Sequence, residues 1–272
     1  MSNIILHEYR IRIPGVSPKV LYHFSDVHLS LSDALSTPEE CAKAAEKTQS
    51  WEKERLNFAK HHGEPHDASA PIAASDYLDA LLRTAQGGDA LVIAGDLFDY
   101  VSPANVRAYE ARFGSLPFPH MFVRGNHESV KSIPDGSRLA KIKRPVQLLD
   151  LGDLMIAGFD DAARVISAEQ LDALRSLLAQ PKPLIIALHI PIQTQDNAQH
   201  RHCDDYFRLN YEGAPAENLA FIDLICQNAG KIAAVLAGHL HFLNACELAP
   251  GIPQYVSSQG ILGNINRYYI GE

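Results

Sequence analysis

The stretch ALVIAGDLFD, residues 90–99, is a short apolar run that ends abruptly in a glycine and two carboxylates. A run this short is typical of a buried strand rather than of a helix. The same arrangement recurs along the chain, at residues 20–24, 121–123, 184–188 and 232–237. The sequence therefore predicts a set of buried strands, each followed directly by polar residues.

Segments with helical periodicity alternate with these runs. Apolar residues recur at a helical spacing over 72–85, 167–179 and 216–226, and Ser167 is a favourable N-cap for the second of these segments. Strands that alternate with helices indicate an α/β fold. Residues 4–13 and 253–270 look like antiparallel strands instead, so we expect the sheets to be mixed.

The chain is predicted to form a single domain over residues 1–272, because no linker or internal repeat divides it. Residues 38–62 are expected to form an inserted amphipathic helix, either a cap or an oligomer contact, with its lysines on a solvated face. Residues 193–215 form a polar loop without periodicity, and loops of that length are often functional. The expected apolar stripe of the inserted helix consists of Cys41, Ala44, Ala45, Thr48, Trp51, Phe58 and Ala59.

Composition and charge narrow the class of protein. The chain has 46% hydrophobic and 21% charged residues, which is ordinary for a globular protein and excludes a disordered or collagen-like chain. The net charge of -8 argues against a general nucleic-acid binder. The scattered cysteines indicate reduced thiols, and we find neither a signal-peptide pattern nor a membrane-spanning apolar run. We therefore predict a cytoplasmic protein with no membrane or stable nucleic-acid partner.

Side chains that can bind metal ions follow each predicted strand. Taken singly, these motifs are typical of ordinary turns and of surface or buried histidines. Because the carboxyl ends of strands in α/β proteins meet at one crevice, their joint occurrence favours a functional site. The side chains are Asp26 and His28, Asp96 and Asp99, Asn126 and His127, His189, and His239 and His241.

The chemistry of these groups indicates a binuclear metal centre. Carboxylates, imidazoles and an amide oxygen suit Zn, Mn, Fe or Mg, and together they exceed what one ion needs. Sharing of Asp96 between two ions would account for the surplus. Gly95, Gly125 and Gly238 each stand shortly before a candidate ligand, where glycine permits a tight backbone turn.

In their order along the chain, D-x-H, GD-x-x-D, GNH-E, a lone His and GH-x-H, these motifs resemble the calcineurin-like metallophosphoesterases from Asp26 to His241. They are similar to the small-molecule phosphodiesterase and phosphatase branch. The resemblance implies two packed mixed β-sheets flanked by helices. One departure is Tyr100, which stands where many members have an arginine, so a phosphate contact is either missing or supplied elsewhere.

The resemblance also implies a role for each residue. His127 would donate a proton to the leaving group, and Asp99 would orient His127. The first ion would be held by Asp26, His28, Asp96 and His241, and the second by Asp96, Asn126, His189 and His239.

The predicted function is hydrolysis of a small phosphodiester or phosphomonoester, with a nucleotide among the candidates, by a hydroxide that bridges two divalent ions. Mn is the first candidate for the ions, and Fe, Zn, Mg, Ni and Co are alternatives. The 193–215 loop offers Arg201, His202, Tyr206 and Arg208 to the substrate. Two alternatives stay open: a DNA nuclease of the same superfamily, and a metal-binding scaffold without turnover.

Overall fold

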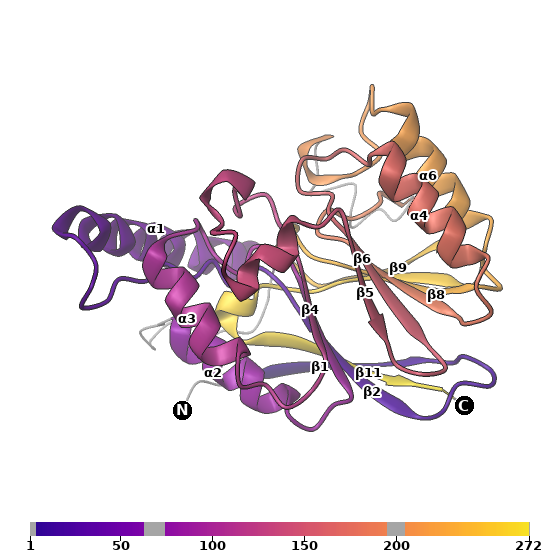
Figure 1. The fold of residues 1–272 in the computed structure, drawn as a ribbon, viewed down its shortest axis with the longest axis horizontal. Helices are drawn as coiled ribbons and strands as arrows, with labels where there is room; N and C mark the ends of the chain where they lie inside the picture. Colours follow the sequence, from indigo (N-terminus) through magenta and orange to yellow (C-terminus); the bar gives the residue numbers. More distant parts are fainter. Residues whose placement is uncertain (1–3, 63–73, 195–204, 272) are drawn as a thin grey trace.

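Two β-sheets pack face to face between two pairs of helices in the computed structural model, which describes residues 4–62, 74–194 and 205–271 (Figure 1). One pair of helices, α2 and α3, covers the outer face of the first sheet, and the other pair, α4 and α6, covers the second. This architecture is the one predicted from the sequence. The helices are α2 (Ala74–Ala85), α3 (Pro103–Phe113), α4 (Ala168–Leu178) and α6 (Ala216–Cys226).

The first sheet has the strand order β1-β11-β2-β3-β4. Strands β2, β3 and β4 are parallel, whereas β11 is antiparallel to β2 and pairs in parallel with β1. Both ends of the chain thus run antiparallel to the central strands, as expected, although they are parallel to each other. The strands are β1 (Ile5–Ile11), β2 (Lys19–Phe24), β3 (Ala90–Ala94), β4 (His120–Val123) and β11 (Asn264–Ile270).

The second sheet has the strand order β5-β6-β7-β8-β10-β9, with antiparallel pairing at its two edges. The sequence analysis missed β5, β6, β9 and helix α3. Its single stretch 253–270 proves to be two strands in different sheets, β10 and β11, joined through the 3-10 turn Gly260–Leu262. The strands are β5 (Val146–Asp150), β6 (Met155–Phe159), β7 (Leu184–Ala187), β8 (Ile232–Ala237), β9 (Asn244–Ala249) and β10 (Ile252–Val256).

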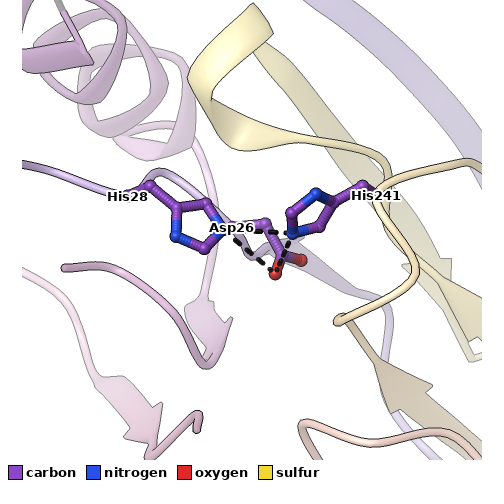
Figure 2. A group of neighbouring side chains, drawn as sticks. All are labelled: Asp26, His28 and His241. Carbon is purple, nitrogen blue, oxygen red and sulfur yellow. Dashed lines mark hydrogen bonds and ion pairs between the residues drawn. The ribbon is translucent and has the colours of Figure 1, made fainter. Parts of the chain in front are cut away.

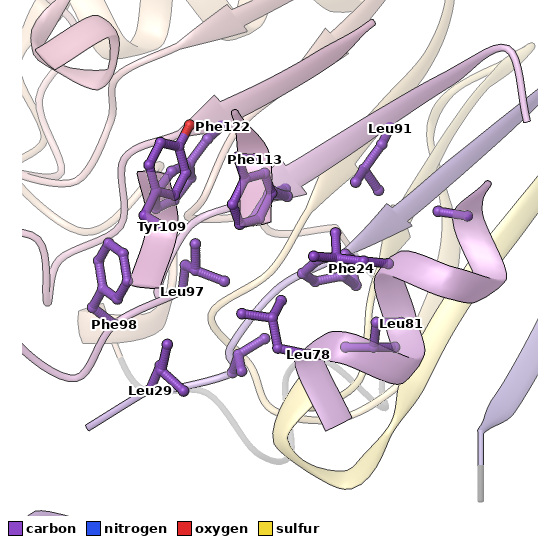
Figure 3. Packing of buried hydrophobic residues seen from close by; sticks show 14 of the residues in the cluster. Phe24, Leu29, Leu78, Leu81, Leu91, Leu97, Phe98, Tyr109, Phe113 and Phe122 are labelled. Atoms are coloured by element: carbon purple, nitrogen blue, oxygen red, sulfur yellow. The ribbon is translucent and has the colours of Figure 1, made fainter. Parts of the chain in front are cut away.

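Apolar side chains fill the layers between sheets and helices. Figure 3 shows the layer beneath α2 and α3, where Leu78 and Leu81 lie against Phe24. Ser167 caps α4 as predicted, since its hydroxyl accepts the N–H of Gln170, whose side chain accepts the N–H of Ser167 in return. The core between the sheets includes Val92, Val123, Ile156, Ile185 and Leu236.

Helix α1 (Pro38–His62) confirms the helix predicted at these residues and extends from one side of the molecule (Figure 1). Ala44 and Trp51 of its predicted stripe are buried, whereas Ala45 and Thr48 are exposed, so only part of the stripe faces inward. The side chains of Phe58 and Ala59 lie outside the described part of the chain. Short 3-10 turns complete the secondary structure, at Val130–Ser132, Arg138–Lys143 and Asp205–Phe207. No helix in the described ranges is long and apolar enough to cross a membrane.

Asn105, at the buried start of α3, ties together the loops that follow β2 and β3. Its side-chain oxygen accepts the N–H of Leu31 at 2.9 Å. Its amide nitrogen donates to the carbonyls of Leu29 at 3.0 Å and Tyr100 at 2.8 Å. Both loops carry predicted metal ligands, so this amide helps to set the position of the site.

Asn105→Asp should therefore lower the free energy of unfolding by about 2–4 kcal/mol, because an aspartate leaves two carbonyls without their donor and buries a charge. Urea denaturation measures the change. Asn57→Asp, an exposed site on α1, is the matched control and should stay within about 0.5 kcal/mol of wild type. Equal stability of Asn105→Asp and wild type would contradict this role.

Candidate metal centre

The strand ends of the two sheets bring six of the seven predicted metal ligands into two compact clusters. The first consists of Asp26, His28 and His241, and the second of Asp96, His189 and His239. Within each cluster, one ligand atom of every residue lies within 4.8 Å of the others. Each cluster combines residues of both sheets, so the site lies where the two sheets meet.

In the first cluster the side chains point toward one another (Figure 2). The Nε2 atom of His241 lies 3.3 Å from Oδ1 of Asp26, and Nε2 of His28 lies 3.8 Å from the same oxygen. The two Nε2 atoms are 3.1 Å apart. Burial, reinforced by His241, lowers the pKa of His28 to about 3, so this imidazole is neutral, as a metal ligand must be.

In the second cluster Nε2 of His189 lies 3.2 Å from Oδ2 of Asp96 and 2.9 Å from Oδ1 of Asn126. Asn126, the seventh predicted ligand, therefore joins this group. Burial opposes a charge on His189, but the Asp96 carboxylate raises its pKa to about 10, so this position favours a cation. Nε2 of His239 is buried and has no hydrogen-bond partner in the described part of the chain, so its lone pair fits a metal ion.

Each buried carboxylate uses its two oxygens differently. Asp26 accepts the N–H of His239 at 3.0 Å with Oδ2, while Oδ1 faces the imidazoles. Asp96 accepts the N–H of His127 at 2.9 Å with Oδ1, while Oδ2 faces His189. One oxygen thus fixes a loop and the other points into the cluster. The backbone carbonyl of Asp96 also accepts the N–H of His28 at 3.0 Å, so Asp96 lies next to a residue of the first cluster.

The backbone at the predicted ligands is unusual. Among the described residues, six that are not glycine have a positive φ, and five of them are predicted ligands. Asp and His tolerate this left-handed conformation better than most residues, yet each instance costs roughly 1–3 kcal/mol. Such a concentration indicates a site that the fold holds in place. The five are Asp26 (56°), His28 (49°), Asp96 (49°), His239 (70°) and His241 (59°).

The predicted glycines have more than one purpose. Gly95 has a φ of +87°, as expected for a tight turn, and a Cβ there would lie 2.2 Å from Nδ1 of His189. Gly125 has no positive φ; a Cβ at this position would lie 2.2 Å from Oδ1 of Asp96. Gly125 therefore permits close approach of a backbone to a carboxylate rather than a left-handed turn.

Two buried acids that the sequence analysis did not assign hold the loops of the second cluster. Glu128 accepts the N–H groups of Asp96, Phe98 and Gly125 at 2.8–3.1 Å. Asp161 accepts those of His189 and Ile190, both at 2.9 Å. Asp161 follows β6 as Asp96 follows β3, so the apolar run 155–159 was the signal that could have identified it.

The predicted proton donor lies beside the first cluster. Nδ1 of His127 is 2.9 Å from Oδ1 of Asp99 and 3.0 Å from the Asp99 carbonyl oxygen, so Nε2 is the nitrogen left to face a substrate. Burial lowers the pKa of His127, but Asp99 outweighs it and raises the value to about 9. His28, Asp99 and His127 form a third group compact enough to hold an ion. The structure thus brings the predicted pair together without testing the role of either residue.

The loop residues and the lysines of α1 depart in part from expectation. Tyr206 reaches the second cluster: its hydroxyl accepts a 3.4 Å hydrogen bond from Asn126, and its ring lies 5.5 Å from that of His239. Arg208 donates to the side chain of Gln193, within the same loop. Lys47 of α1, predicted to be solvated, is 41% exposed and also places its Nζ 3.3 Å from Oδ2 of Asp99, a contact that was not predicted. Arg201 and His202 lie outside the described residues.

Comparison with known proteins identifies the family. The sequence model of the calcineurin-like phosphoesterases matches residues 19–243. The chain belongs to this family. It is accordingly a metallophosphoesterase, an enzyme that hydrolyses phosphoric esters, and its two clusters are candidate sites for the metal ions on which the family depends. No curated protein sequence matches it significantly.

One solved structure supports the fold, and two others are given with it for comparison. A dimetal phosphatase from Danio rerio superposes with a TM-score of 0.56 at 12% identity, covering 89% of this chain and 88% of that one. A purple acid phosphatase from yellow lupin gives 0.49 at 13% identity, covering 92% and 45%. A phosphopantetheinyl hydrolase from Mycobacterium tuberculosis gives 0.42 at 12% identity, covering 89% and 90%. The first of these similarities shows the shared fold and nothing of the substrate.

Asp96→Asn tests the predicted bridge. We expect this variant to lose bound metal and turnover together, because the amide lacks the negative charge that two cations would share. Elemental analysis of the purified protein and a phosphate-release assay measure the two quantities. Asp172→Asn, an exposed aspartate on α4, is the control and should retain both. Full occupancy by two ions in an active Asp96→Asn protein would refute the shared carboxylate.

Proposed function

We propose that this chain hydrolyses small phosphate monoesters or diesters, nucleotides among them, with two divalent cations, Mn²⁺ first, held by the two clusters. The observation that carries the proposal is the position of Asp96, a buried carboxylate of one cluster whose backbone carbonyl accepts the N–H of His28 of the other cluster at 3.0 Å. Two cations bound there would activate a water molecule for attack and neutralise the phosphoryl oxygens. A cytoplasmic location remains part of the proposal.

The chain's own residues would then handle the leaving group. His127 is 30% exposed, so a substrate can reach it, whereas the Asp99 carboxylate that contacts it is 1% exposed. A buried carboxylate at Nδ1 orients the ring and keeps the opposite nitrogen available for donation of a proton to the departing oxygen. Tyr206, which is 47% exposed beside His239, offers an aromatic face on which a planar group could stack.

The acidic character of the chain favours small substrates over DNA. A protein with a net charge of -8 repels a polyanion, whereas a small ester needs only the local positive charge of the metal centre. The nuclease alternative is therefore the weaker one. The family assignment, together with the presence of all seven predicted ligands and His127, argues against the scaffold alternative.

A substrate screen tests this proposal. Protein loaded with Mn²⁺ should release phosphate from mononucleotides if it is a monoesterase. If it is a diesterase, it should release p-nitrophenolate from bis(p-nitrophenyl) phosphate and hydrolyse cyclic nucleotides. In either case it should leave linear duplex and single-stranded DNA intact. Degradation of DNA alone would favour the nuclease. Stoichiometric binding of two Mn²⁺ ions without hydrolysis of any ester would favour the scaffold.

His127→Ala should retain both ions and yet discriminate between leaving groups. An alkoxide must be protonated as it departs, whereas a nitrophenolate is stable near neutral pH. General acid catalysis contributes roughly 10²–10⁴ in rate, so the variant should lose about that factor with alkyl or nucleoside esters and much less with nitrophenyl esters.

Steady-state kcat with both ester types, under conditions in which chemistry limits turnover, measures this difference. Asp99→Asn should show the same bias more weakly, because it disturbs the imidazole without deleting it. His120→Ala, at the opposite end of β4, is the control and should show no bias. Equal loss with both ester types in His127→Ala would exclude the proton-donor role.

A further inference from the structure

Helix α1 places two side chains against the metal centre. Lys47 and Trp51 are four residues apart, so they lie one turn apart on the same face of the helix. The buried Ala44 lies on this face as well. Most other residues of α1 are exposed, so this face is where the helix meets the rest of the protein.

Trp51 covers the ring of His28. The two rings stack with centroids 3.6 Å apart and an interplanar angle of 17°. Trp51 also packs with Ile261 and Leu262 of the 3-10 turn before β11, so its indole is itself held in place. A ring stacked at this distance restricts rotation of the imidazole about its side-chain bonds and sets the direction in which its nitrogens point.

Lys47 and His127 share one carboxylate. Nζ of Lys47 lies 3.3 Å from Oδ2 of Asp99, and Nδ1 of His127 lies 2.9 Å from Oδ1. Exposed ion pairs usually contribute little, and Lys47 is 41% exposed. Here, however, the carboxylate is 1% exposed, and no backbone N–H in the described part of the chain donates to it, so its orientation depends on these side chains.

We propose that α1 is part of the active site, with Trp51 positioning the ligand His28 and Lys47 positioning the Asp99–His127 pair. The assignment rests on the proposed function and deepens it, because it names residues outside the family motifs on which that function depends. A helix that served only as an oligomer contact would not need these two residues to contact the site.

Binding of Mn²⁺ in the absence of substrate tests the role of Trp51. Groups that orient a metal ligand typically change metal affinity by about 10–100-fold when removed, so Trp51→Leu should weaken Mn²⁺ binding by about that factor, measured by calorimetry. Trp51→Phe keeps a ring on His28 and should bind Mn²⁺ more tightly than Trp51→Leu. Trp51 is the only tryptophan of the chain, so in the wild-type protein its emission should be quenched as paramagnetic Mn²⁺ occupies the first cluster.

Wild-type Mn²⁺ affinity in folded Trp51→Leu would overturn the role of Trp51. If that variant does not fold, the fluorescence decides: emission that stays unchanged while elemental analysis shows two bound ions would overturn it equally. Wild-type protein that binds no Mn²⁺ at all would instead refute the proposed function, so the two failures are distinguishable.

Leaving-group dependence tests the role of Lys47. Lys47→Met removes the charge and keeps most of the side-chain length. It should lower kcat with alkyl esters by about 10-fold, with KM and nitrophenyl ester hydrolysis nearly unchanged, because it acts through His127. Lys53→Met, an exposed lysine of the same helix, is the matched control and should match wild type.

Equal effects of Lys47→Met on both ester types, or no effect on either, would overturn the role of Lys47, since loss of helix stability alone does not discriminate between leaving groups. Thermal unfolding of each variant, compared with wild type, confirms that folded proteins are being compared. If His127→Ala itself shows no leaving-group dependence, the proposed proton donor is wrong, and the Mn²⁺ titration of the Trp51 variants still tests the contribution of α1.

Discussion

Burial of two carboxylates at the junction of the sheets is the constraint on which the site depends. Asp26 and Asp96 are almost inaccessible to solvent, and a buried charge is costly unless it is hydrogen-bonded and paired. Each is stabilised on one oxygen by a backbone N–H from a loop distant in sequence, at His239 for Asp26 and His127 for Asp96. The other oxygen of each faces imidazoles, where a cation would complete the compensation. The carboxylates thus join the loops and define the metal centre.

The left-handed backbone at the ligands follows from this constraint. One oxygen of each carboxylate must reach a backbone N–H, and the other must point into the cluster. The chain must therefore turn sharply where each strand ends. The fold stabilises these turns with buried acids, Glu128 behind Asp96 and Asp161 behind His189, each accepting more than one N–H. Apolar layers on both sides of each sheet then offset the conformational cost of the strained loops.

The features that could be predicted from the sequence are those with a local pattern, an apolar run followed by polar residues. Buried strands such as 90–94 and 232–237 are continuous apolar runs, and the ligands follow them directly, so both were predicted with their boundaries. Edge strands such as β5 and β9 are partly exposed and carry no such run. Trp51 has a helical spacing that indicates only an inward face. The contact of Trp51 with His28 depends on how the inserted helix packs against the rest of the chain, and no local sequence pattern encodes that packing.

The metal ligands and the leaving-group machinery are held in different ways. Asp26 and Asp96 are each anchored on one oxygen by a backbone N–H group. Asp99 is contacted by Lys47 and His127, and in the described part of the chain no backbone donor reaches its carboxylate. A carboxylate has enough lone pairs to serve both cations at once, so its orientation is a compromise between these two side chains. Substitution of Lys47 can therefore retune proton donation without altering a metal ligand, which makes this position of α1 one where substrate preference can diverge.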